Sequence, residues 1–124
     1  MYTLDTNAVI YYLGEEKESY DVLSKIFSND SNFYLSTITE LELLSFKELT
    51  QSAKERIETL LKYSSFLIPV DSNIARIGAS IRRDTNIETA DSAIAATAIA
   101  TGSTLVTRNV KDFKRIPNLQ ILKI

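Results

Sequence analysis

The chain has 124 residues, of which 44% are hydrophobic and 24% charged, a composition typical of a domain with a buried core and not of a disordered tail. It contains no cysteine and no histidine, which excludes disulfides, thiolate nucleophiles, histidine-dependent catalysis and the ordinary structural zinc sites. The net charge of −2 does not indicate a general nucleic-acid binder, and without a long apolar run or a signal peptide we expect a cytoplasmic protein that makes no membrane contact.

Short β-rich runs alternate with stretches of helical spacing along the chain. In chain order, the pattern predicts a strand at 1–4, helices at 6–13 and 18–27, a strand at 32–36, helices at 37–46 and 50–63, a strand at 66–70, helices at 72–83 and 90–101, and strands at 105–107 and 119–124. Pro69 indicates that the third strand lies at a sheet edge, and Gly102 is a good stop for the last long helix. We therefore expect a single α/β domain over 1–124, a three-layer α/β/α sandwich around a central, mainly parallel five-stranded sheet.

Acidic or amide side chains follow several of the predicted strands. In an open parallel sheet, ligands bind beyond the carboxyl ends of the strands, so these positions are the candidates for chemistry. They are Asp5 after the first strand, Glu42 in the helix after the second, Asp91 in the first turn of the alanine-rich helix, and Asn109 and Asp112 after the fourth strand.

Each of these residues also has a purely structural explanation. Asp5 is a good helix N-cap, Asp91 would interact favourably with its helix dipole, and Asn109 with Asp112 fits a variant of the capping box. Two further capping boxes compete after the second strand. Thr37 precedes Glu40 by three residues, Thr39 precedes Glu42 by the same interval, and the spacing leaves open which glutamate is structural.

Taken together, the converging carboxylates indicate a metal. Two carboxylates about 4 Å apart repel by roughly 4 kcal/mol at an effective dielectric near 20, so a cluster needs a shared proton or a cation. The strand-end motifs offer no histidine or lysine as a counter-charge. Oxygen ligands alone favour hard ions, and we expect one or two Mg²⁺ or Mn²⁺ ions.

Charge is distributed unevenly along the chain. Residues 1–60 carry a net −6, residues 61–100 are balanced and residues 101–124 carry +4. The basic end contains Arg108, Lys111, Lys114 and Arg115, which could contact phosphates, although a solvated helix face explains the composition equally well.

Four segments of the chain resemble the PIN-domain ribonucleases and, within them, the VapC-like toxins of toxin–antitoxin pairs. They are Leu4-Asp5-Thr6-Asn7, the run from Ser36 to Leu43, the Asp-x-x-Ile-Ala-Ala-Thr-Ala helix from Asp91 to Ala98, and the stretch from Leu105 to Phe113 followed by Ile116-Pro117-Asn118-Leu119. The resemblance covers essentially the whole length, and it aligns Glu42, not Glu40, with the second acid of the family.

The resemblance implies a metal-dependent endoribonuclease that leaves a 5′-phosphate. Asp5, Glu42 and Asp91 would hold the ions, and Asn109 and Asp112 would complete the catalytic site, with Asp112 as the nearest further carboxylate ligand. Thr6, Asn7 and Thr107 would orient ligands or water, and the four basic residues of the C-terminal stretch would position the RNA. The resemblance also implies a cognate antitoxin and a homodimer.

Two departures from the family pattern stand out. Phe46 replaces a glycine that often follows the second acid, and Glu88-Thr89-Ala90 stands where a proline is usual near Asp91. Neither removes an expected ligand.

Other classes fit the sequence less well. A phosphoacceptor receiver domain would use Asp71 and Thr107, but it needs paired acids after the first strand, and Lys123 lies inside the terminal strand. A haloacid-dehalogenase-like phosphatase needs Asp-x-Asp after the first strand, where residue 7 is Asn. The closest alternative is a PIN domain that binds RNA or a partner without cutting.

Overall fold

The computed structural model describes residues 1–29, 33–63 and 66–124. Within them, five parallel strands form one sheet in the order β3-β2-β1-β4-β5. The strands are β1 (Tyr2–Leu4), β2 (Phe33–Ser36), β3 (Phe66–Ile68), β4 (Thr104–Thr107) and β5 (Ile121–Lys123). The predicted parallel sheet is confirmed, and β3, directly before Pro69, lies at its edge as expected.

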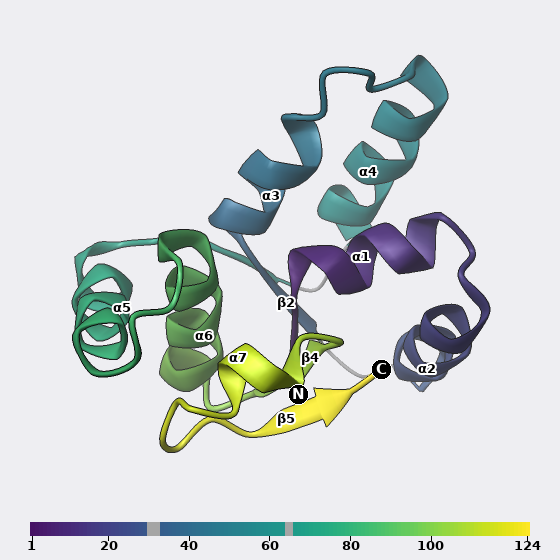
Figure 1. Ribbon diagram of the computed structural model, residues 1–124. Coiled ribbons are helices and arrows are strands. Elements are labelled where there is room, and N and C mark those ends of the chain that lie inside the picture. The colour runs from purple at the N-terminus through teal and green to yellow at the C-terminus, as the bar shows by residue number, and fades with distance from the viewer. Residues whose placement is uncertain (30–32, 64–65) are drawn as a thin grey trace.

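Helices cover both faces of this sheet. They are α1 (Thr6–Leu13), α2 (Lys17–Ser28), α3 (Thr37–Leu44), α4 (Gln51–Tyr63), α5 (Ser72–Thr85), α6 (Thr89–Thr101) and the single-turn α7 (Val110–Phe113). Figure 1 shows α5 and α6 on one side of the strands, α1 and α2 on the other, and the α3–α4 pair projecting beyond the sheet. The arrangement confirms the predicted three-layer α/β/α sandwich. No described helix is both long and apolar enough to cross a bilayer.

Neighbouring residues of one strand pack into two separate hydrophobic cores, because successive side chains point to opposite faces of the sheet. Val106 packs with Leu4 and Leu35 beneath α1 and α2, whereas Leu105 packs with Ile94 of α6 on the opposite face. All five of these side chains are fully buried. The two hydrophobic layers hold the strands in place, and therefore also the polar residues at their carboxyl ends.

The connectivity produces a switch point at the centre of the sheet. From β1 the chain moves outward to β2 and β3, and then returns to the other side of β1 to form β4 and β5. β1 and β4 are paired, with Leu4 opposite Val106, and the amide of Asp5 donates to the carbonyl of Val106 at 3.0 Å. The loops that leave these two strands run apart, which is where doubly wound folds leave room for a ligand.

The local boundaries differ from the sequence-based ones in specific places. The last strand is shorter than predicted, because the chain turns through Asn118 with a positive φ of 64° before pairing begins at Ile121. The predicted strand start at residue 32 lies outside the described residues. Neither predicted capping box at the start of α3 forms. Ser36 is the N-cap, and its hydroxyl accepts a hydrogen bond from the amide of Ile38 at 3.1 Å.

Candidate active site

Asp5 sits at the carboxyl end of β1, at the switch point. It holds the N-cap position of α1, but its side chain makes no capping bond. Instead, the hydroxyl of Thr107 donates to Asp5 Oδ2 at 2.7 Å across the junction of β1 and β4. The carboxyl is only 3% exposed, and burial raises its pKa despite the opposing effect of the Thr107 bond. A carboxylate removed from water without a cation beside it is a poor structural choice, which favours a functional role.

Glu42 reaches the same region from the second turn of α3. The hydroxyl of Thr6, the residue after Asp5, donates to Glu42 Oε1 at 2.7 Å and lies 3.1 Å from the hydroxyl of Thr39. Glu42 is thereby tied to the start of α1, and the charge of Glu42 contributes to raising the pKa of Asp5. Thr39 is a buried partner that the sequence analysis treated only as a possible cap.

Asp91 is half-buried in the first turn of α6, and its pKa responds to the charges of the other acids. Its pKa is raised from 3.8 to about 6, first by burial and then by the negative charges of Asp5, Glu88, Glu42 and Asp112. These carboxylates come from four different segments of the chain. The charges of the predicted acids therefore act on Asp91, and Glu88, the N-cap residue of α6, acts on it as well. The sequence could have indicated Glu88, because it precedes Asp91 by three residues at the start of the same helix.

Asn109 and Asp112 follow β4. We call the region of Asp5, Glu42, Asp91 and Asp112 the acidic cleft. Asn109 occupies the N-cap position of α7 without a side-chain capping bond, and its Nδ2 donates to Asp112 Oδ2 at 2.9 Å. The amide of Asn109 donates to the hydroxyl oxygen of Thr107 at 3.0 Å. One line of hydrogen bonds thus runs from Asp5 through Thr107 and Asn109 to Asp112.

The donor set suits a hard divalent ion by its chemistry, because every candidate ligand atom is an oxygen. Among the described residues, no three acidic side chains already surround one point closely enough to chelate an ion. Thr107 holds Asp5, and Thr6 holds Glu42, each by a hydrogen bond of 2.7 Å. Asp112 accepts a hydrogen bond from Asn109, and Asp91 is half-buried. Their mutual repulsion, evident at Asp91, is what an ion between them would relieve.

The remaining predicted residue near the acids is Asn7. It is exposed and lines a cavity of about 400 Å³ together with Thr6 and Glu42. An amide at this position faces solvent beside the carboxylate of Glu42, where it can hydrogen-bond a bound water or a substrate oxygen.

The four basic residues that were predicted to contact RNA fall into three situations. Lys111 and Lys114 are exposed on and directly after α7. Arg115 lies 3.7 Å from Asp112 in an exposed ion pair. Arg108 points away from the cleft, because its Nη2 donates to Glu16 at 2.7 Å and to Ser19 at 2.9 Å, and its guanidinium stacks over a tyrosine. The two exposed lysines are the basic side chains best placed to contact a substrate.

A separate apolar groove adjoins the site. It has a volume of about 550 Å³ and lies between α1, α3 and the start of α4. Phe46, which stands where the family usually has a glycine, is 50% exposed and lines both this groove and the cavity beside Glu42. Phe46 therefore places an apolar side chain beside Glu42.

Comparison with known proteins agrees with this geometry. The PIN domain family matches residues 2–119 of the chain. The chain is similar to "Ribonuclease VapC2" of Rickettsia felis, at 30% identity over 96% of this chain and 94% of that protein.

Two solved structures share the fold. One is VapBC2 from Rickettsia felis bound to a DNA fragment from its promoter, with a TM-score of 0.82 and 26% identity over 99% of this chain and 98% of that one. The other is DNA-bound VapBC from Salmonella typhimurium, with a TM-score of 0.84 and 25% identity over 98% and 96% of the two chains.

Proposed function

The chain belongs to the PIN domain family, and from that premise we propose that it is a metal-dependent endoribonuclease, the toxin of a toxin–antitoxin pair. The relative in Rickettsia felis is named a ribonuclease, and the chain spans nearly the whole of that protein. The observation that carries the proposal is the state of Asp91, whose pKa is raised to about 6 by burial and by four surrounding carboxylates.

That observation favours a divalent cation as the counter-charge of these acids. The sequence has no histidine, and among the described residues the one cation paired with an acid of the cleft is Arg115, in a long and exposed contact with Asp112. Asp5, Glu42 and Asp91 would hold one or two Mg²⁺ or Mn²⁺ ions, with Asp112 and Asn109 completing the site directly or through water. When bound, such an ion activates water and stabilises the charge on a phosphodiester during in-line attack.

The neighbouring hydroxyls orient the acids for that task. Thr107 holds Oδ2 of Asp5 by a hydrogen bond, and Thr6 holds Oε1 of Glu42 in the same way. Burial raises the pKa of Asp5, and the Thr107 hydroxyl opposes this effect by favouring the ionised carboxylate. A carboxyl that must ionise in a buried place is supported in this way without a cationic side chain.

RNA would approach over α7. Lys111 and Lys114 are exposed there beside Asp112 and can pair with backbone phosphates on either side of the scissile bond. Their charge offsets the repulsion between an acidic cleft and a polyanion.

The proposed partner is an antitoxin, since a solved structure that is similar to this chain is a toxin–antitoxin complex. The groove between α1, α3 and α4 suits an apolar segment of such a partner, because Ile10, Leu13, Leu43, Phe46 and Leu49 line it. It shares Ile10 and Phe46 with the cavity at Glu42, so a bound segment would also cover that carboxylate. The expected homodimer and cytoplasmic location remain predictions.

Cleavage of RNA by the purified chain tests the proposal. We expect single-stranded RNA to be cut in Mg²⁺ or Mn²⁺, to be spared in EDTA, and to carry a 5′-phosphate at the new end. The Asp91→Asn variant serves as the matched inactive control. A chain that binds RNA in both conditions and cuts it in neither is the non-cutting PIN domain and refutes the nuclease.

A further inference from the structure

We propose that Arg108 is a positioning residue, which anchors the β4–α7 connection and so holds Thr107 and Asp112 at the acidic cleft, and that it does not contact RNA. The inference rests on the proposed ribonuclease function and adds to it a role for a residue that lies beside the site yet faces away from it.

Arg108 is fixed by three partners on a different part of the fold. Nη2 donates to Glu16 Oε2 at 2.7 Å and to Ser19 Oγ at 2.9 Å. The guanidinium carbon also lies 3.9 Å from the ring centre of Tyr11. A planar guanidinium can bind in a fork and stack on an aromatic ring at the same time, which a lysine cannot do.

The partners of Arg108 on α1 and α2 are themselves held by further contacts. Glu16 is the N-cap of α2, where its carboxylate accepts from the amide of Ser19 at 3.1 Å, and its pKa is lowered by Ser19 first and by Arg108 second. Ser19 is completely buried. Beneath them, α1 and α2 are joined through Tyr12, which stacks on Tyr20 at 5.2 Å between ring centres.

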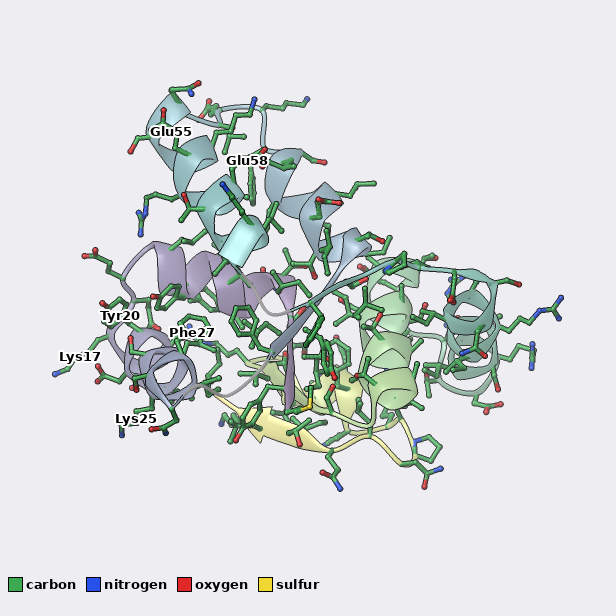
Figure 2. The ribbon with its side chains drawn as sticks, turned by 180° about the vertical axis from the view of Figure 1, so that it is seen from behind. Lys17, Tyr20, Lys25, Phe27, Glu55 and Glu58 are labelled. Carbon is green, nitrogen blue, oxygen red and sulfur yellow. The ribbon has the colours of Figure 1, made fainter. Side chains whose placement is uncertain are left out.

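A second ring completes that junction. Phe27 meets Tyr12 edge-on at 4.9 Å. Figure 2 shows Tyr20 and Phe27 on α2, where it lies against α1. The partners of Arg108 therefore belong to a packed helix pair and not to a loose loop.

The residues on either side of Arg108 both touch the cleft. Thr107 donates to Asp5 at 2.7 Å, and Asn109 donates to Asp112 at 2.9 Å. Arg108 is the residue between them, so its side chain fixes the backbone from which both contacts are made. Loss of this anchor would loosen Asp112 more than Asp5, since Asp5 is also held by β1.

An RNA contact would require Arg108 to leave its present partners. The side chains of Arg108 and Glu16 are 37% and 40% exposed, so water weakens their ion pair. The hydroxyl of Ser19 and the ring of Tyr11 hold the same guanidinium, however, and a phosphate would have to replace all three contacts. Lys111 is exposed nearby without such restraints, which favours it as the phosphate contact.

The salt dependence of RNA binding separates the two roles of Arg108. It is measured by fluorescence anisotropy with a short labelled single-stranded RNA, without metal, in the Asp91→Asn background so that nothing is cut. Removal of one phosphate contact lowers the slope of log K against log salt by about 0.7 for a single strand. We expect Arg108→Met to leave the slope unchanged and Lys111→Met to lower it. A lowered slope in Arg108→Met overturns the inference.

The Glu16→Gln variant distinguishes a positioning role of Arg108 from an RNA-binding role, because the two roles predict different RNA affinities. If Arg108 is a positioning residue, this variant leaves RNA affinity at the level of Glu18→Gln, which removes the same charge from an exposed site on α2. If Glu16 merely restrains an RNA-binding arginine, Glu16→Gln releases it, and RNA binds more tightly than in the Glu18→Gln control. That second result overturns the inference.

The anchoring role of Arg108 is tested by measuring kcat and the rise in melting temperature that Mn²⁺ causes. We expect Arg108→Met to lower kcat several-fold at unchanged KM and to reduce the rise in melting temperature caused by Mn²⁺. Arg108→Lys should recover only part of both effects, and Arg83→Met, at an exposed arginine of α5, should change neither. Full kcat and a full Mn²⁺ response in Arg108→Met would refute the anchor.

Two failures are distinguishable here. If the wild-type chain cuts no RNA, the proposed function fails, and the Mn²⁺-induced stabilisation still tests the role of Arg108. If Arg108→Met does not fold, Glu16→Gln and Arg108→Lys test the same contacts, and wild-type values for both variants in every assay would refute the inference.

Discussion

The hydroxyl of Thr107 donates a 2.7 Å hydrogen bond to Oδ2 of Asp5, although the two residues are 102 positions apart in the chain. Both side chains are buried; Asp5 directly follows the central strand β1, and Thr107 is the last residue of the neighbouring strand β4. The contact therefore fixes the first acid of the cleft to the loop that carries Asn109 and Asp112. It also favours ionisation of a carboxyl whose pKa burial raises.

Replacement of Thr107 by valine removes this donor while nearly keeping the side-chain shape. Without it the pKa of Asp5 rises further, since the hydrogen bond lowers it. We expect the acidic limb of the pH–rate profile to move to higher pH, with activity partly recovered in alkaline buffer. Lost bonds to Asp5 and to the amide of Asn109 should lower the free energy of unfolding by roughly 2 kcal/mol.

Thr107→Ser is the matched control, because it keeps the hydroxyl. Its pH–rate profile should stay close to that of the wild type. A valine variant whose profile also superimposes on the wild type would show that the bond does not set the ionisation of Asp5.

Asp91→Asn should abolish cleavage and, without metal, leave the protein equally or more stable at neutral pH. The folded pKa of about 6 lies above the ordinary 3.8, so the carboxyl favours folding when protonated, and this contribution is lost as the pH rises through 6. The gain at pH 8 should be about 1 kcal/mol or less, since water screens a half-exposed carboxylate.

Thermal melting in EDTA between pH 4 and pH 8 measures that effect. The difference between Asp91→Asn and the wild type should shrink toward acid pH, where the wild-type carboxyl is also neutral. An asparagine variant that is much less stable at pH 8 would instead assign Asp91 a structural role.

Residues that lie next to a predicted strand could be placed from the sequence. Asp5 and Asp112, which follow β1 and β4, were expected at one end of the sheet, and their charges add to the effect of burial in raising the pKa of Asp91. This succeeds because parallel strands separated by helices force their carboxyl ends to one edge. The position of each of these acids depends on the fold alone, and the alternation of strand and helix patterns predicts that fold.

Contacts between distant side chains could not be placed in the same way. Arg108 was expected to face RNA, and its pairing with Glu16 depends on how the α1–α2 turn packs against the end of β4. Asp5 was an equally good helix cap by sequence, because nothing local reveals a donor such as Thr107. Side-chain partners from remote segments are chosen by tertiary packing, which leaves no periodic signal.

The start of α3 shows the same limit at short range and gives a stability test. Spacing allowed Thr37 with Glu40 or Thr39 with Glu42 to cap this helix, whereas the completely buried Ser36 does so.

Ser36→Ala should therefore lower the free energy of unfolding by about 1 kcal/mol in urea denaturation, since the amide of Ile38 loses its acceptor. Glu40→Ala should lower the free energy of unfolding much less. A larger loss in Glu40→Ala than in Ser36→Ala would instead indicate that Thr37 and Glu40 form the capping box.

Mg²⁺ or Mn²⁺ should raise the melting temperature of the wild-type chain, because an ion that binds only the folded state stabilises it by mass action. At ten times the dissociation constant the gain is about 1.4 kcal/mol. Asp5→Asn should blunt this response, since a buried carboxylate oxygen at the switch point is lost while the Thr107 hydroxyl keeps an acceptor.

Asp84→Asn is the matched control for that experiment, because Asp84 is an exposed acid on α5, outside the cleft. It should respond to Mn²⁺ as the wild type does, and NaCl of equal ionic strength should not reproduce the shift. Equal Mn²⁺ responses in Asp5→Asn and Asp84→Asn would mean that the ion binds elsewhere. The repulsion that adds to burial in raising the pKa of Asp91 would then have to be relieved by a proton shared among the acids.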